Sequence, residues 1–430
     1  MNAKTLALLA LLSAVPQERA PLPIVLFLSD DHGQGDATPY GAKDVRTPNM
    51  ERLAAAGMTF THAFAPSPSC APCRASLLTG LMPARHGAHV NHAQPKPETK
   101  KLPAHLKELG YEVAAFGKVA HYNQDKLYGF DHYDKDGSAA TVRAWLATRA
   151  STKPLLLIVG THQPHVPWPE ETAYDPAALT VPPSHVDTPE TRAFRARYYA
   201  DVTIADADLG AIYDLAREKL GPNHLFLHTS DHGSQWPFGK WNLYDAGTRV
   251  PFFAVWPGVI PPGSRSDAML SLVDLLPTFV ELAGGKPPEG LDGRSIAGIL
   301  RGEKKEHRDR IFTTHSRDGN MNVYPIRSVR TREWKYIRNL KPDAEHTTHI
   351  DKARARDGVG YFTSWERDGK AVVARYHRRP AEELYDVRSD PHELRNLAAD
   401  PAHAEALVRL RAELDAWMKE QGDPGDPSGK

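Results

Sequence analysis

Short, uninterrupted apolar runs alternate along most of the chain with longer stretches of helical periodicity. The apolar runs, rich in Val, Leu, Ile and Phe, lie at residues 22–29, 111–116, 155–159, 225–227 and 250–256. Runs of this kind are typical of strands that are buried on both faces of a sheet. The periodic stretches predict helices at residues 48–56, 102–109, 192–220 and 270–282. This alternation predicts an α/β fold, with a doubly wound sheet that carries helices on both faces.

The pattern changes after about residue 308. Three short runs at residues 311–314, 326–330 and 334–338 indicate a meander of strands, and residues 402–420 have helical periodicity. We therefore expect a large domain at residues 21–308 and a C-terminal α+β subdomain at 309–430, built from a small antiparallel sheet and a helix. Residues 422–430 are expected to fray.

The N-terminus has the character of a targeting segment. Residues 1–4 include a positive charge, and residues 5–15 form an apolar run that suits a signal peptide but is too short to span a bilayer. We expect residues 1–20 to be a signal peptide and the protein to be periplasmic or secreted. The alternative is a buried N-terminal helix. No later stretch is long and apolar enough to predict a membrane span.

Charge and cysteine content narrow the classes of function. Lys plus Arg and Asp plus Glu balance at 53 each, and this zero net charge argues against bulk attraction to nucleic acid or to an anionic membrane. An anionic substrate would have to be held by local basic residues. The chain has 2 cysteines, Cys70 and Cys73, so the fold does not depend on a disulfide framework.

Acidic residues follow two of the predicted strands in the same way. Asp30 and Asp31 end the run at 22–29, Asp231 follows the run at 225–227, and both segments continue into His and Gly. Because ligands collect beyond the carboxyl ends of the strands in an open α/β sheet, these carboxylates should share one crevice. Clustered carboxylates favour a hard cation, Ca²⁺ or Mg²⁺. The alternative is that each Asp caps the turn that follows it.

Cys70 begins the most specific motif of the chain, Cys70-x-Pro72-x-Arg74 followed by Thr79-Gly80. The Cys-x-x-Cys spacing also fits a redox pair or half of a zinc site, but the chain has no second cysteine pair to complete a zinc ribbon. The motif resembles the one by which type I sulfatases mark a cysteine for oxidation to formylglycine. Residues 22–420 as a whole are similar to that family.

The resemblance implies an alkaline-phosphatase-like mixed sheet, with residues 21–308 as the catalytic domain. It implies one divalent cation, with Ca²⁺ as the family expectation and Mg²⁺ as the alternative. The implied partners are a sulfated saccharide, a formylglycine-generating maturation enzyme and a second copy in a homodimer. The implied metal ligands are Asp30, Asp31, the formylglycine made from Cys70, Asp231 and His232.

The same resemblance assigns catalytic roles around the formylglycine. Arg74 would orient it, and Lys118 would bind a sulfate oxygen. His121 would assist proton removal from its second hydroxyl, and His162 would protonate the leaving group or hold the sulfate. Lys240 would support the leaving atom.

Six further histidines lie in or near these motifs. His32, His165 and His228 are expected to be surface or hydrogen-bonded residues. His86, His89 and His92 form an i, i+3, i+6 series. These three either line the pocket or are surface or hydrogen-bonded residues as well.

Two branches of the family compete for the substrate. Residues 230–244 and the run at 324–330 resemble the heparan N-sulfatase branch, which implies hydrolysis of the sulfamate on glucosamine of heparin or heparan sulfate fragments. His232 stands where that branch has Asn and, like the Lys118/His121 spacing, matches the iduronate-2-sulfatase branch, so an O-sulfatase is the alternative. A phosphoester hydrolase or a non-catalytic metal-binding domain is a third reading. Arg327 and Arg330 would contact sugar anions or be solvated.

Overall fold

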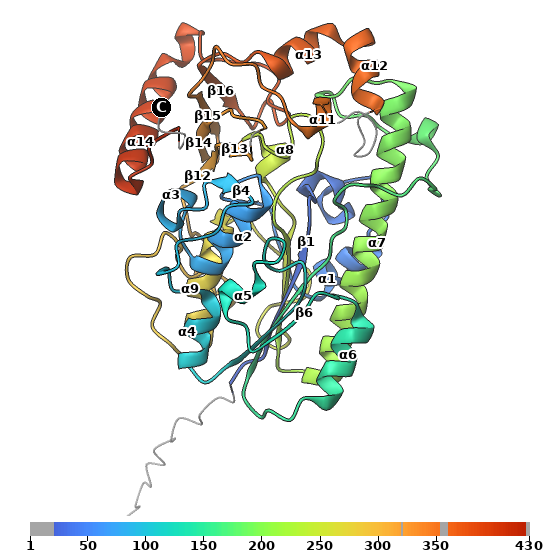
Figure 1. Ribbon diagram of the computed structural model, residues 1–430, viewed down its shortest axis with the longest axis vertical. Coiled ribbons are helices and arrows are strands. Elements are labelled where there is room, and N and C mark those ends of the chain that lie inside the picture. Colours follow the sequence, from blue (N-terminus) through green and yellow to red (C-terminus); the bar gives the residue numbers. More distant parts are fainter. Residues whose placement is uncertain (1–20, 320, 353–359, 427–430) are drawn as a thin grey trace, which may run out of the picture.

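The computed structural model describes residues 21–319, 321–352 and 360–426 (Figure 1). The signal peptide expected at residues 1–20 lies outside the described residues and stays a prediction. Figure 1 shows a large sheet flanked by helices, with a smaller C-terminal sheet above it.

The large sheet has eight strands in the order β10-β2-β9-β8-β1-β7-β5-β6. Strands β8, β1, β7, β5 and β6 are mutually parallel, whereas β9 runs antiparallel to both β8 and β2. The sheet is therefore mixed, as expected. The strands are β1 (Ile24–Ser29), β2 (Met58–Phe60), β5 (Glu112–Gly117), β6 (His132–Asp134), β7 (Leu155–Gly160), β8 (Leu225–Ser230), β9 (Phe252–Val255) and β10 (Ser264–Ser266).

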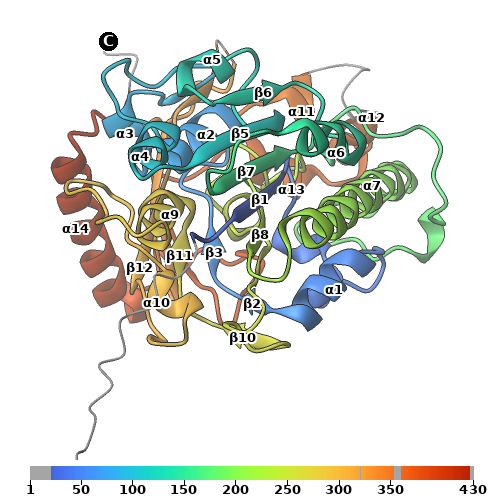
Figure 2. The same cartoon turned by 90° about the horizontal axis from the view of Figure 1, so that it is seen from below.

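Helices cover both faces of this sheet (Figure 2). On β1, Leu26 and Leu28 join the apolar cluster of one face, and Val25 and Phe27 join that of the other. This double burial explains why the strand is an uninterrupted apolar run. One face carries α2 (Cys70–Thr79), α4 (Leu102–Glu108) and α9 (Leu275–Leu282); the other carries α1 (Pro48–Ala56), α6 (Ala139–Thr148) and α7 (Pro189–Leu220).

The smaller sheet is antiparallel, with the order β12-β14-β15-β16. Leu410, Leu414 and Trp417 of α14 pack on it against Val329 and Tyr336. The expected fold class is confirmed, whereas the boundary at 308/309 stays a prediction. The elements here are β12 (Arg310–His315), β14 (Ile326–Thr331), β15 (Trp334–Asn339), β16 (Glu382–Asp386), α11 (His349–Lys352), α12 (Gly360–Asp368), α13 (Lys370–His377) and α14 (Ala404–Gln421).

Short elements complete the described chain. Two pairs of short strands are parallel: β3 with β11, and β4 with β13. These elements are β3 (Ala63–Phe64), β4 (Val90–Asn91), β11 (Leu270–Ser271), β13 (Arg317–Asp318), α3 (Pro83–His86), α5 (Asp125–Tyr128), α8 (Asp245–Thr248) and α10 (Ala297–Leu300).

Two local predictions are wrong. The segment 270–282 is not one helix, because Leu270 pairs with Ala63 in β11 and a 3-10 turn at Leu272–Asp274 precedes α9. Residues 422–426 are not frayed, because the carboxylate of Asp423 accepts two hydrogen bonds from the buried Arg327. Residues 427–430 of the same prediction lie outside the described residues.

Within the described ranges, no helix has both the length and the apolar character needed to cross a membrane.

Candidate active site

Cys70 is the first residue of α2, and the helix brings its side chain to the carboxyl ends of β1 and β8. All residues of α2 are buried, and Gly80 ends the helix in the left-handed region at φ 67°. Arg74 lies one turn after Cys70, on the same side of the helix. A single helical turn therefore supplies the site with both a thiol and a guanidinium group.

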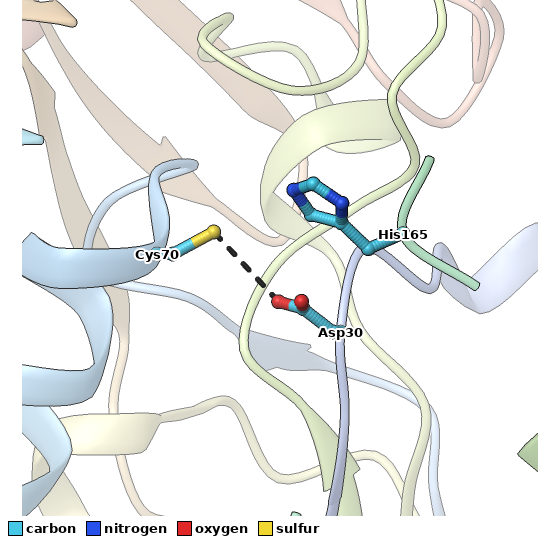
Figure 3. Close-up of side chains that lie close together, drawn as sticks. All are labelled: Asp30, Cys70 and His165. Atoms are coloured by element: carbon cyan, nitrogen blue, oxygen red, sulfur yellow. Dashed lines mark hydrogen bonds between the residues drawn. The ribbon is translucent and has the colours of Figure 1, made fainter. Parts of the chain in front are cut away.

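Three carboxylates meet opposite the thiol. Ser29 of β1 is in register with Ser230 of β8, so the residues that follow these strands share one edge of the sheet. Asp30, Asp31 and Asp231 are at most 1% exposed, and each offers an oxygen within 4.8 Å of the others. The Cys70 Sγ lies 3.7 Å from Asp30 Oδ1, and Figure 3 shows the two side chains pointing toward each other.

Three buried cations compensate this acidic cluster. Arg74 donates from Nη2 to Asp30 Oδ1 and from Nε to Asp231 Oδ2, both at 3.0 Å. Lys118 Nζ donates to Asp30 Oδ2, and Lys240 Nζ donates to Asp31 Oδ2 at 2.7 Å. Burial by itself would raise the pKa of Asp30, but Lys118 and Arg74 outweigh it and hold that pKa well below its ordinary value.

The cations do not stabilise the charged form of all three carboxylates equally: the pKa of Asp30 and of Asp31 is lowered, whereas that of Asp231 is raised. Burial raises the pKa of Asp231, and the neighbouring His232 and Arg74 do not overcome that effect. Asp31 adopts a positive φ of 64°, and its Oδ1 atom, although buried, has no hydrogen-bond partner. A buried carboxylate oxygen without a partner is costly unless a cation binds it.

Two histidines also face this cluster. His232 Nδ1 lies 3.0 Å from the carbonyl oxygen of Gly233, and His165 Nδ1 lies 2.7 Å from that of Val166. A carbonyl only accepts, so each Nδ1 carries the hydrogen and a neutral ring has its lone pair on Nε2. These Nε2 atoms lie 3.4 Å and 3.8 Å from the carboxylate of Asp31.

Converging lone pairs and carboxylate oxygens repel one another unless a cation lies between them. The oxygen-rich donor set, the partnerless Asp31 Oδ1 and the two imidazole lone pairs therefore fit a divalent cation. Metal binding by Asp30, Asp31, Cys70, Asp231 and His232 stays a prediction with that physical support.

His165, expected to be a surface or hydrogen-bonded residue, lies in the site. Its side chain is 20% exposed, and its ring lies with Asp30 and Cys70 in a group whose ligand atoms are within 4.8 Å of one another (Figure 3). Its position three residues after His162, at the end of a buried strand, was the available signal. His32 and His228 are buried and hydrogen-bonded to backbone carbonyls, as expected.

Lys118 and His121 lie on the loop that follows β5. Gly117 precedes them at φ 68°, and a Cβ there would lie 2.0 Å from the carbonyl oxygen of Gly160, so only glycine fits. Arg74 donates to the Lys118 carbonyl and thereby fixes the loop against α2. Burial, followed by the charge of Lys118, lowers the pKa of His121 to about 2.

The rim of the site is aromatic. His162 is exposed, and its ring stacks on Tyr122 with centroids 6.2 Å apart. Tyr122 is 48% exposed and also lies 4.8 Å from the ammonium group of Lys118. Tyr122 belongs to none of the motifs that predict the site.

Other predicted residues have structural partners. Arg327 and Arg330 are at most 2% exposed and pair with Asp423 and Asp245, so they are neither solvated nor free to bind sugar anions. His86 bonds to Ser76 Oγ at 2.9 Å and so belongs to the packing of α2. Cys73 is a free, buried thiol that donates to the Asp231 carbonyl.

Comparisons with known proteins agree with this geometry. Residues 23–143 and 139–285 match the family described as sulfatase, and residues 232–354 match the one described as N-sulphoglucosamine sulphohydrolase, C-terminal. An ulvan-active sulfatase of Formosa agariphila is 32% identical over 93% of this chain and 80% of its own length. Human N-sulphoglucosamine sulphohydrolase is 30% identical, covering 94% of this chain and 91% of its own.

Solved structures share the fold. A protein solved in complex with its substrate D-glucosamine-2-N,6-O-disulfate has a TM-score of 0.71 at 19% identity, covering 96% of this chain and 100% of that one. The phosphonate monoester hydrolase of Agrobacterium radiobacter has a TM-score of 0.73 at 19% identity, covering 93% and 96%. At this identity the fold alone is shared, and it does not separate sulfur from phosphorus chemistry. The family match and the similar sulfatases distinguish the two chemistries. They show that the chain belongs to the sulfatase family of enzymes, which hydrolyse sulfate esters or sulfamates.

Proposed function

We propose that the protein is a formylglycine-dependent sulfohydrolase that releases sulfate from N-sulfated glucosamine of heparin or heparan sulfate fragments. The observation that carries the chemistry is the Cys70 thiol at the start of α2, 3.7 Å from a buried carboxylate of a three-aspartate cluster. The similarity to human N-sulphoglucosamine sulphohydrolase over 94% of the chain supports the sulfamate as the bond that is cleaved.

Two groups would supply chemistry that the unmodified chain lacks. Formylglycine made from Cys70 supplies, as its hydrate, a hydroxyl nucleophile at the N-terminus of α2. Asp30, Asp31, Asp231, His232 and the residue made from Cys70 would hold a divalent cation, which would supply polarisation of a sulfate oxygen. Ca²⁺ is the proposed ion and Mg²⁺ the alternative.

The chain's own residues bind the sulfate and move protons. Lys118 and Lys240 flank the carboxylates with their ammonium groups and bind sulfate oxygens. His165 faces the cluster and contacts the sulfate, whereas the exposed His162 reaches the leaving group and protonates its nitrogen. His121 accepts a proton from the nucleophile's second hydroxyl.

A specific observation favours a second candidate substrate. The ulvan-active sulfatase of Formosa agariphila is 32% identical over 93% of this chain. The resemblance of His232 and of the Lys118/His121 spacing to the iduronate-2-sulfatase branch points the same way. An O-sulfate ester on another saccharide is therefore the competing substrate.

A panel of defined saccharides tests the proposal. Protein made in a host with a maturation enzyme should release sulfate from N-sulfated glucosamine faster than from 2-O- or 6-O-sulfated disaccharides or from sulfated ulvan oligosaccharides. If an O-sulfated saccharide of the panel releases sulfate faster, the substrate is a sulfate ester and not a sulfamate. Cys70→Ala is the control: it should leave the fold intact and abolish release, and retained turnover would refute the role of Cys70.

Mass spectrometry of the peptide that contains Cys70 tests the modification directly. We expect an aldehyde in protein from a host with a maturation enzyme, and an intact thiol from its native host would count against the proposal. We further propose export to the periplasm or the outside of the cell, where sulfated polysaccharides are found. Homodimer formation stays a prediction.

A further inference from the structure

We propose that Asp318 and His92 act as positioning residues that hold His121 in the tautomer whose Nδ1 atom accepts a proton. The inference rests on the proposed function for the role of His121, but the arrangement of the three side chains does not depend on it.

The three side chains form a continuous line. His121 Nε2 lies 2.7 Å from His92 Nδ1, and His92 Nε2 lies 3.2 Å from Asp318 Oδ1. The rings of the two histidines are 4.7 Å apart between centroids. A base histidine is thus linked through a second histidine to a carboxylate that is 5% exposed.

Two short strands bring these residues together. His92 directly follows β4 at a positive φ of 68°, and Asp318 ends β13. The strands are parallel, with Asp318 in register with Asn91. Asn91 is itself tied to the active-site helix, because its Oδ1 accepts a hydrogen bond from the backbone N–H of Ala71. The pairing of β4 with β13 therefore places the carboxylate next to the catalytic loop.

Two groups face His92 Nε2: Asp318 Oδ1 at 3.2 Å and the amide nitrogen of Asn91 at 3.5 Å. A carboxylate only accepts, so a neutral His92 that directs its Nε2–H to the nearer Asp318 keeps its lone pair on Nδ1. That lone pair accepts from His121, so the hydrogen of His121 is on Nε2. The lone pair of His121 is then on Nδ1, a buried atom that has no hydrogen-bond partner.

Charge explains why a carboxylate belongs at the end of this line. When Nδ1 accepts a proton from a reacting hydroxyl, His121 becomes a cation beside other cations, and Asp318 offsets part of that charge through His92. The proton is later returned to water. The groups that face this line are Lys118, Arg74 and Asp30 around His121, Tyr122 against both rings, and His349, whose Nε2 is 3.7 Å from Asp318 Oδ2.

Nitrogen NMR of the histidine rings tests the inference on protein with an unmodified Cys70 and no added metal. Long-range ¹H–¹⁵N spectra distinguish a ring nitrogen with a lone pair from one with a hydrogen, and His92→Asn and His121→Asn identify the signals. We expect His121 to carry its hydrogen on Nε2. In Asp318→Ala and in His92→Leu, the population with the hydrogen on Nδ1 should rise.

A matched control uses the second partner of the same carboxylate. His349→Gln removes a group that contacts Asp318 but not His92, and it should leave the His121 signals unchanged. If Asp318→Ala does not fold, His92→Leu tests the same link, because the His92 side chain is 56% exposed. Unchanged His121 tautomers in the variants that fold would overturn the proposal.

Kinetics add a second readout. Asp318→Ala should lower kcat by about 10- to 100-fold with little change in KM, because a partly exposed relay is less effective than a fully buried triad. The tautomer spectra separate a positioning role from a structural defect: loss of positioning lowers kcat together with a rise in the His121 population that carries its hydrogen on Nδ1. A purely structural defect would lower kcat without changing that population. If the spectra change as expected while no sulfated saccharide is hydrolysed, the proposed function fails and the positioning role stands.

Discussion

At the scale of single residues, Arg74 organises the charges of the site. Its guanidinium group binds Asp30 through Nη2 and Asp231 through Nε, and its Nη1 donates to the carbonyl oxygen of Lys118. The side chain is 1% exposed. A planar fork reaches all three acceptors at once, which the single ammonium group of a lysine cannot do. Arg74 therefore joins both acidic strand ends to the catalytic loop.

Arg74→Met should lower the free energy of unfolding by about 3–5 kcal/mol, because it leaves two buried carboxylates without their shared partner. Urea denaturation at neutral pH measures the change. Arg52→Met is the control: Arg52 pairs with Asp214 across a surface where the two side chains are 44% and 53% exposed, and such pairs contribute about 0–1 kcal/mol. Similar losses in both variants would contradict the central role of Arg74.

At the scale of elements, the sequence predicted what is decided locally. The strands that became β1 and β8 and the acidic residues after them follow from buried runs, and α2 follows from the Cys70 motif and Gly80. Leu270 was misassigned because its pairing with Ala63 is a contact across 207 positions of the chain, which periodicity does not contain.

The wrong assignments of single side chains have the same cause. The sequence predicted Arg327 and Arg330 to be available to solvent or to sugar anions, because their carboxylate partners are distant in the chain. Asp423 lies 96 positions from Arg327, and Asp245 lies 85 positions from Arg330. His165 read as a bystander because only the fold brings Asp31 and Cys70 to its ring. Partners of this kind become visible only when the strands are assembled.

Asp274 shows how one carboxylate sets the start of an element. Its Oδ2 accepts from the backbone N–H of Ser271 at 2.9 Å, which caps the 3-10 turn at Leu272–Asp274 that precedes α9. The same carboxylate accepts from Arg308 and from His307 Nε2. Burial would raise the pKa of Asp274, but Arg308 and His307 outweigh it and lower that pKa.

Asp274→Asn should keep the cap and lose the ion pair, lowering the free energy of unfolding by about 3–5 kcal/mol at pH 7. The pKa of Asp274 in the folded protein lies below that of the unfolded chain, about 3.9, so the unfolded state binds the proton first. The stabilisation is complete above about pH 5 and is lost as the pH falls through the folded pKa.

Urea denaturation from pH 7 down to pH 2 should show a shallower fall in stability for Asp274→Asn than for the natural sequence. Asp267→Asn is the control, since Asp267 pairs with Arg332 at the surface with 71% of its side chain exposed. Parallel pH profiles for the natural protein and Asp274→Asn would rule out this account.

At the scale of the whole molecule, buried ion pairs join the small sheet to the active-site side of the large one. Asp245 of α8 pairs with Arg330 of β14 and with Lys335 of β15, both of them buried. Arg327 of β14 in turn binds Asp423, beyond the end of α14. The chain end is thereby tied to the sheet that contacts the catalytic loops.

Asp423→Ala should lower the free energy of unfolding by about 3–5 kcal/mol, because Arg327 is 0% exposed and would keep a buried charge without a carboxylate partner. Thermal and urea unfolding measure the effect. Lys341→Ala is the control in the same segment: Lys341 pairs with Asp426 where the side chains are 37% and 24% exposed, and a small loss is expected. A negligible effect of Asp423→Ala would mean that the chain end does not stabilise the sheet.

Divalent cations should stabilise the whole molecule through the acidic cluster. An ion that binds only the folded state adds about 2.7 kcal/mol when present at 100 times its Kd, so Ca²⁺ or Mg²⁺ added to chelator-treated protein should raise Tm. Asp31→Asn should abolish the shift, because Asp31 Oδ1 is the buried oxygen without a partner. Asp214→Asn, at a site where the side chain is 53% exposed, should keep it. The same shift in Asp31→Asn as in the natural protein would place the ion elsewhere, and comparing the two ions at equal concentration would show which one the cluster prefers.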